Sequence, residues 1–301
     1  MNDTASFINK LNYEFTLITS IILCAAGFIG NTITFLIMMT PEMRKISLFR
    51  YIMVSMINDC LVLASMWFFT LPDIFRFSSN SCKWTSYSCM LVFKYSGWIV
   101  VLSLIDRLLS VKYPTMFKFR NELKFQAFIL LTVLILIALL TIPNYTYYDM
   151  QHGSSNKTSC TTANPQIQFY LTIFDSLIAI IIPFFVMTII TIMIGHSLIK
   201  KRKSLAITKE FKKEIRLVKL MFSMSASFLL FNLPFYIQQL IHDILSFEDS
   251  SLFVSNYIFS FSFNITNQLS YVYNSFGFFV CLFSNKVFRN YFYSKFRFLK
   301  I

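Results

Sequence analysis

Residues 82–107 read CKWTSYSCMLVFKYSGWIVVLSLIDR, and this stretch is the most informative part of the chain for predicting the fold. It is largely apolar, with a cysteine at its first position and an Asp-Arg pair at its last two. A helix from Cys82 to Arg107 would be roughly 37 Å long at about 1.5 Å per residue. Because the hydrocarbon core of a membrane is only about 30 Å thick, each end must lie outside one membrane face. The stretch therefore predicts a membrane-spanning helix with a cysteine on one side and an ion pair on the other.

Composition extends this prediction to the whole chain. Hydrophobic residues make up 56% of the 301 positions, charged residues only 14%, and mean hydropathy is positive, a balance that a soluble domain of this size does not tolerate. There is no internal repeat and no low-complexity linker, so we expect residues 1–301 to form one all-α membrane domain. Seven apolar segments are long enough to cross a membrane: Glu14–Met39, Ser47–Leu71, Trp84–Ser110, Phe125–Tyr148, Gln168–Ile199, Arg216–His242 and Leu252–Phe283.

Basic residues set the expected orientation. With the Asp106–Arg107 end inside the cell, 22 of the 27 Lys and Arg residues face the cytoplasm, four lie outside, and Lys94 lies within the membrane. The positive-inside rule then predicts an external N-terminus in a multi-pass protein of the plasma membrane. The net charge of +13 is thus a sign of topology and requires no nucleic-acid partner. Two sequons, at Asn2 and Asn156, fall on the external side, as glycosylation requires.

Short motifs recur along these segments in a fixed order. They are Gly30-Asn31, Asp59, Cys82, Asp106-Arg107-Leu108 with Pro114, Pro183, Phe228 through Pro234, and Asn274 through Phe278. In order and spacing they resemble the rhodopsin-like (class A) family of G-protein-coupled receptors over essentially the whole chain. The resemblance implies a seven-transmembrane helix bundle, an extracellular ligand and a heterotrimeric G protein as the cytoplasmic partner.

Departures from the family pattern are also informative. Leu108 replaces the tyrosine after the arginine, Asn232 the sixth-span tryptophan, Ser275 the seventh-span proline and Phe278 the seventh-span tyrosine. Family members use the fifth- and seventh-span tyrosine hydroxyls to hold the active state, and Thr191 and Phe278 stand in those places here. Divergence of this kind suggests an invertebrate receptor of the neuropeptide type whose coupling efficiency is in more question than its fold.

Cysteine positions predict one disulfide. Of the six cysteines, only Cys82 and Cys160 lie clearly on the external, oxidising side. We expect a bond between them that pins the loop of residues 147–165 to the top of the third helix. Cys89 is a rival about two turns below Cys82, but its place inside a span favours a buried thiol.

Asp59 is an ionisable residue inside a predicted span, where an unpartnered charge is costly. The family resemblance adds Ser96, Ser270 and Asn274 as its neighbours. These oxygens suit a hard cation such as sodium. A water-filled polar cluster without an ion is the alternative, and we expect no other cofactor.

Five residues are candidates for ligand binding: Cys89, Lys94, Asp175, Asn232 and Gln268. Cys89 stands where monoamine receptors carry an aspartate, and Gln268 stands where opsins carry the retinal-binding lysine, so neither chemistry is available. Lys94 and Asp175 lie at heights that line the ligand cavity in the family. They either satisfy each other as an internal salt bridge, or Lys94 receives a ligand carboxylate or carbonyl.

The outer surface carries seven acidic residues and four basic ones, an imbalance that would attract a cationic ligand. We therefore favour a short basic or amidated peptide as the ligand. A small chemosensory molecule is the alternative.

The inner half of the chain carries the candidate G-protein switch, which comprises Asp106, Arg107, Glu214, Pro234, Asn274 and Phe278. Glu214 lies 20 residues before Pro234, which places it about 30 Å along a helix from the proline and near the level of Arg107. In the family a carboxylate at this level pairs with the arginine. Pro234 breaks the hydrogen-bond ladder and would supply a kink about which the lower half of the helix moves outward.

Residues 285–298 follow the last span and alternate aromatic with basic side chains, a pattern that predicts an amphipathic helix in the membrane interface.

Other classes of membrane protein do not fit the sequence. A channel or transporter would be expected to show inverted repeats or a line of polar pore residues, and neither is visible. His152, His196 and His242 are scattered and no catalytic motif occurs, so we do not expect an enzyme.

Overall fold

The computed structural model describes residues 2–70, 78–113, 118–152, 158–204, 209–247 and 257–295, and the chain within these ranges is almost entirely helical. The long helices are α1 (Asn2–Met38), α3 (Ser47–Thr70), α4 (Ser79–Lys112), α5 (Leu123–Leu140), α7 (Pro165–Ser176), α8 (Ile182–Ser204), α9 (Lys209–Phe247) and α11 (Tyr257–Ser284). The shorter elements are α2 (Pro41–Arg44), the 3₁₀-helix η1 (Lys118–Asn121), α6 (Ile142–Tyr147), the strands β1 (Tyr148–His152) and β2 (Thr158–Thr162), the π-helical segment η2 (Leu177–Ile181) and α12 (Lys286–Lys295).

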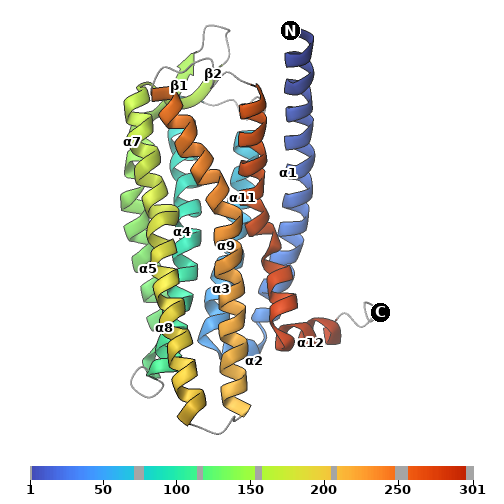
Figure 1. Cartoon of the computed structure of the whole chain (residues 1–301), viewed down its shortest axis with the longest axis vertical. Helices are drawn as coiled ribbons and strands as arrows, with labels where there is room; N and C mark the ends of the chain where they lie inside the picture. The colour runs from blue at the N-terminus through green and yellow to red at the C-terminus, as the bar shows by residue number, and fades with distance from the viewer. Residues whose placement is uncertain are drawn as a thin grey trace.

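The long helices lie side by side as a bundle (Figure 1). The antiparallel strands β1 and β2 cover the end at which the N-terminus lies, and α12 points sideways away from the bundle near the opposite end. We call these the outer and the inner end, after the orientation that the sequence predicts. Six helices of the described residues are long and apolar enough to cross a membrane: α1, α3, α4, α5 with α6, α7 with α8, and α9. α11 is not among these six, although it packs against α1 and α9 as an integral part of the bundle.

Glycines mark the places where helices approach most closely. A Cβ atom added at Gly97 of α4 would lie 2.9 Å from the Phe228 ring of α9 and 3.0 Å from the Ala179 carbonyl oxygen of η2. Both distances are too short for a larger residue, since the interior is already close-packed. At Gly30 of α1 the same atom would lie 2.9 Å from Phe278 of α11. α4, α9 and η2 therefore meet at the middle of the bundle.

Two prolines interrupt segments that the sequence predicted as continuous spans. The predicted span Phe125–Tyr148 is divided at Thr141, because Pro143 lies in the first turn of α6 and cannot donate a backbone hydrogen bond to continue α5. The predicted span Gln168–Ile199 contains the π-helical turn η2 just before Pro183. Both interruptions lie beside the polar residues described below.

The outer loop contains structure that an all-helical prediction omitted. Tyr148–His152 and Thr158–Thr162 pair as the antiparallel strands of the β1–β2 hairpin, with Met150 opposite Cys160. The hairpin is tied to α4, since the Ser79 hydroxyl donates a 2.6 Å hydrogen bond to Asp149 and Lys83 lies 3.5 Å from the same carboxylate. The Ser79 bond, the Met150 backbone N–H and nearby Lys83 hold the pKa of Asp149 below its usual range.

Candidate functional site

The disulfide predicted from topology is present. Cys82 and Cys160 are bonded, with their Cα atoms 5.6 Å apart, so the hairpin is fixed covalently to the first turn of α4. Cys89, the rival partner, is a buried free thiol, as are Cys24 and Cys281. The bond lies at the outer end of the bundle, where a cavity with polar lining residues is found.

This outer cavity has a volume of about 240 Å³ and is lined by α4, β1, α7, α9 and α11. Of the five predicted ligand-binding residues, Asp175 lines it. Cys89, Asn232 and Gln268 are buried elsewhere: the Asn232 side chain donates to the Phe228 carbonyl oxygen at 2.8 Å, and the Gln268 side chain lies 3.4 Å from the Ser20 hydroxyl. The lining residues are Met90, Phe93, Tyr148, Gln168, Thr172, Asp175, Ser176, Phe235, Tyr236, Gln239, Phe263, Asn267 and Tyr271.

Lys94 does not line the cavity, but it forms an ion pair with Asp175, which does. The Lys94 Nζ atom lies 2.7 Å from Asp175 Oδ1, and the lysine is 1% exposed. The same ammonium group donates to Asn144 at 3.2 Å and to Thr141 at 3.4 Å, and Asn144 in turn donates to Asp175 Oδ2 at 2.7 Å. The break between α5 and α6 thus provides the groups that solvate this buried ion pair. Sequence left two roles open for Lys94, and this geometry is that of the internal salt bridge.

Asp59 lies in a second buried cluster, nearer the middle of the bundle. Asp59 is 2% exposed, and within the described residues its side chain accepts one long hydrogen bond, at 3.5 Å, from the Ser55 hydroxyl. Its Oδ1 atom and the Oδ1 atom of Asn274 are both buried without a hydrogen-bond partner there. Ser96 and Ser270 are buried as well. Two unsatisfied acceptor oxygens fit a cation or ordered water, because either would satisfy them.

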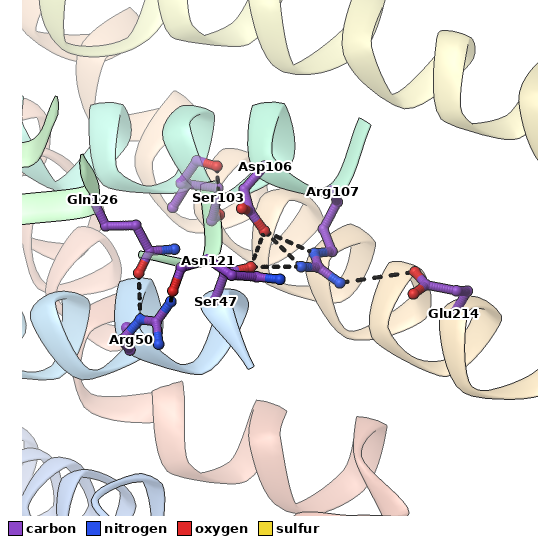
Figure 2. Close-up of polar contacts among 9 residues, drawn as sticks. Ser47, Arg50, Ser103, Asp106, Arg107, Asn121, Gln126 and Glu214 are labelled. Atoms are coloured by element: carbon purple, nitrogen blue, oxygen red, sulfur yellow. Dashed lines mark hydrogen bonds and ion pairs between the residues drawn. The ribbon is translucent and has the colours of Figure 1, made fainter. Parts of the chain in front are cut away.

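The inner end of the bundle holds a network centred on Asp106 and Arg107, shown in Figure 2. Arg107 Nη2 lies 2.6 Å from Asp106 Oδ2 and donates to the Ser47 hydroxyl at 2.9 Å, while that hydroxyl donates to Asp106 at 2.7 Å. Asp106 and Arg107 are both nearly fully buried. Arg107 Nη1 also lies 3.8 Å from Glu214 of α9, whose side chain is one-third exposed. The arginine therefore has a strong partner on its own helix and a weaker one on α9.

Other members of the predicted switch lie apart from this network. Pro234 lies inside α9, which continues through it as one helix. The Asn274 backbone oxygen accepts a 2.9 Å hydrogen bond from Asn31 of α1. Phe278, which replaces a tyrosine, packs its ring 5.3 Å from Phe292 and 6.0 Å from Phe288 of α12. Phe278 therefore joins α11 to α12 through apolar contacts. A tyrosine at this position would also have a hydroxyl group for hydrogen bonding.

Arg50 has a structural role that the sequence does not predict, since the sequence indicates only a basic residue on the cytoplasmic side. Its guanidinium donates to Gln126 and, at 2.6 Å, to the Asn121 carbonyl oxygen (Figure 2). It also donates to the Arg44 carbonyl oxygen at 2.9 Å. Arg44 and Asn121 are the last residues of α2 and η1, so Arg50 satisfies the carbonyl groups at two helix C-termini. These two helix ends come together only in the folded structure, and no local sequence pattern predicts that Arg50 contacts them.

Two further predictions concern the ends of the chain. The predicted interfacial helix of residues 285–298 corresponds to α12, Lys286–Lys295, and residues 296–298 lie outside the described residues. Phe288 and Phe292 of α12 are buried against the bundle. Asn156 lies outside the described residues, and Asn2 is the first residue of α1.

Comparison with known families agrees with this architecture. Residues 30–283 match the family of 7 transmembrane receptors (rhodopsin family), and the chain belongs to that family. No curated protein matches the chain. Members of the family are multi-pass membrane receptors that respond to extracellular ligands and signal through G proteins, and they are not enzymes.

Proposed function

We propose that the chain is a plasma-membrane receptor that takes an extracellular ligand into the outer cavity and activates a G protein by outward movement of the inner half of α9. One observation carries this proposal: the same two helices serve both sites. α4 contributes Phe93 to the cavity and Arg107 to the inner network, and α9 contributes Gln239 and Glu214. A ligand that alters the outer packing of α4 against α9 can therefore bias their inner ends.

The contact between Arg107 and Glu214 is the element to be biased. This contact is long, at 3.8 Å, and the Glu214 side chain is one-third exposed, whereas the bond from Arg107 to Asp106 is short and buried. The interhelical contact is thus weak enough for a ligand to overcome. A bias of about 1.4 kcal/mol changes the population of a rare active state about tenfold.

Glu214→Gln tests this proposal. We expect ligand-independent nucleotide exchange on a heterotrimeric G protein to rise by up to about tenfold, because the inactive arrangement loses its interhelical ion pair. Exchange would be measured with purified receptor in lipid nanodiscs at equal receptor concentration. The control is Glu122→Gln, an exposed glutamate before α5. Equal basal exchange in Glu214→Gln and unmodified receptor would remove Glu214 from the switch.

The topology belongs to the same proposal. We place α11 as the seventh crossing, because it packs against both α1 and α9 and because the matched family has seven. α12 would then lie in the inner membrane interface, with Arg289 and Lys295 at the headgroups and Phe288 and Phe292 against the bundle. The N-terminus would be external, and Asn2 and Asn156 would be open to glycosylation.

The ligand that we favour is a short peptide. Its support is the acidic excess of the outer segments, which would steer a cationic peptide toward the cavity. The alternative, a small chemosensory molecule, would be favoured if a peptide library gave no response while uncharged volatile compounds did.

The Asp59 cluster would bind a sodium ion in this receptor, with oxygens from Asp59, Ser96, Ser270 and Asn274. The ion would supply positive charge to the buried carboxylate, and Asp59→Asn removes that charge without changing the volume. We expect agonist affinity of the unmodified receptor to fall as sodium replaces potassium at constant ionic strength, and expect no such change in Asp59→Asn. Affinity that is indifferent to sodium in the unmodified receptor would indicate a hydrated cluster.

A further inference from the structure

The outer cavity is lined by both polar and aromatic side chains. A polar stripe along α7 is formed by Gln168, Thr172, Asp175 and Ser176, which share one helix face. The other walls carry the aromatic rings of Phe93, Phe235 and Phe263, together with the amide side chains of Gln239 and Asn267. A group held here would place an apolar or aromatic part against the rings and a hydrogen-bonding part against α7.

The carboxylate in this wall is already neutralised. Asp175 is 8% exposed and lines the cavity, while Lys94 is 1% exposed, does not line the cavity and lies 2.7 Å from Asp175. The Asn144 side-chain amide donates a 2.7 Å hydrogen bond to the second carboxylate oxygen of Asp175. A cation entering the cavity would have to compete with Lys94 for Asp175 and would meet the positive charge of Lys94 just behind it. Breaking such a buried pair is costly.

A second carboxylate, Asp243, lies farther out on α9 and does not line the cavity. It is 4% exposed and contacts its own helix neighbours, with His242 at 3.0 Å and the Gln239 side-chain amide at 3.3 Å. Gln239 therefore stands between Asp243 and the cavity, and presents an uncharged amide to a ligand.

Hydrogen-bonding capacity in the cavity remains available. The Ser176 hydroxyl is buried, lines the cavity and has no partner among the described residues. A hydroxyl can donate and accept, so it is best satisfied by a group that does both. An uncharged amide meets this requirement and brings no net charge.

Cavity size limits how much of a ligand can enter. About 240 Å³ is below the roughly 300–1,000 Å³ of sites that enclose a whole drug-sized molecule. The cavity accordingly suits one end of a longer ligand.

We propose that the cavity accepts a neutral amide end that lies next to an aromatic or apolar group, and that Lys94 is the specificity-determining residue that makes the cavity reject cations. This inference rests on the proposed ligand site and separates the two peptide classes left open by sequence, favouring the amidated one over one that inserts a basic end. Lys94 acts through Asp175 and does not touch the ligand.

Three small probes with the same aromatic ring test the charge preference: N-acetylphenylalanine amide (neutral), phenethylamine (cation) and 3-phenylpropionate (anion). Binding to purified receptor would be measured by ligand-observed NMR. We expect the neutral amide to bind at least about tenfold more tightly than either ion. Thr172→Trp, which fills the cavity, should remove this binding. Equal or tighter binding of phenethylamine to the unmodified receptor would overturn the proposal.

Charge variants show whether Lys94 sets the preference. Lys94→Met leaves Asp175 without its cation and should shift the preference to phenethylamine by about tenfold or more. The double variant Lys94→Met/Asp175→Asn removes both charges and should again favour the neutral amide. The double variant keeps the test decisive if Lys94→Met does not fold, since a cation preference in the double variant would also contradict the proposal.

The probe experiment needs no G protein, so it separates two kinds of failure. If the probes discriminate as expected but no ligand stimulates nucleotide exchange, the cavity chemistry stands and the signalling proposal fails. If ligands stimulate exchange while the cavity prefers cations, the signalling proposal stands and the role of Lys94 is wrong.

Discussion

Arg107→Ala is expected to abolish ligand-stimulated nucleotide exchange while leaving ligand affinity unchanged. Arg107 lies at the inner end of α4, far along the helix from the cavity residue Phe93. It is the residue that contacts Asp106, Ser47 and Glu214 at once, so its loss removes the shared partner of α3, α4 and α9. Exchange should fall to the receptor-free rate, because the network loses the residue that joins these three helices.

The matched control is Lys112→Ala. Lys112 is an exposed basic residue in the last turn of the same helix and has no ion pair within the described part of the chain. It should retain most of the exchange activity. Equal loss in Arg107→Ala and Lys112→Ala would show that positive charge near the inner face matters and that the buried network does not. A fall in ligand affinity in Arg107→Ala would show instead that the whole bundle was damaged.

Cys82→Ser or Cys160→Ser is expected to remove most folded receptor from the cell surface. The bond closes a loop across a separation of 78 residues and fixes the β1–β2 hairpin over the outer cavity. Loss of a native disulfide costs about 2–5 kcal/mol, which is a large part of the stability of most domains. Surface expression by antibody labelling, and ligand binding on the remaining receptor, would measure the effect.

Cys24→Ser and Cys281→Ser provide the comparison, because both residues are buried free thiols. Each should lose much less expression than the disulfide variants. Equal tolerance of all four changes would show that the disulfide is dispensable. An equal loss of surface expression in all four variants would show that the assay responds to any change in the core and does not report the disulfide specifically.

Sequence predicted the features that depend on local composition. The apolar runs predicted α1, α3, α4 and α9, because the length needed to cross a membrane can be counted directly. The positive-inside rule left Cys82 and Cys160 as the external cysteines, and the structure contains that bond. The proximity of Arg107 to Glu214 followed from helical rise and from the family resemblance.

What sequence could not predict depends on packing between distant segments. The break at Thr141 matters because it brings Asn144 and Thr141 to Lys94, and nothing in residues 141–144 alone indicates that partner. Arg50 resembled any cytoplasmic arginine until its contacts with Asn121 and Arg44 were known. Family position indicated Cys89 and Gln268 as ligand-binding residues, but neither lines the cavity, whose polar stripe lies along α7.

The most direct test of the central claim is the distance between the inner ends of α4 and α9. Spin labels at Lys112 and Lys212, both exposed, would report this distance by pulsed electron resonance in nanodiscs. We expect the distance to increase by several ångströms when ligand and nucleotide-free G protein are bound. We also expect Glu214→Gln to populate part of the longer distance without ligand. An unchanged distance in receptor that demonstrably stimulates nucleotide exchange would contradict the claim.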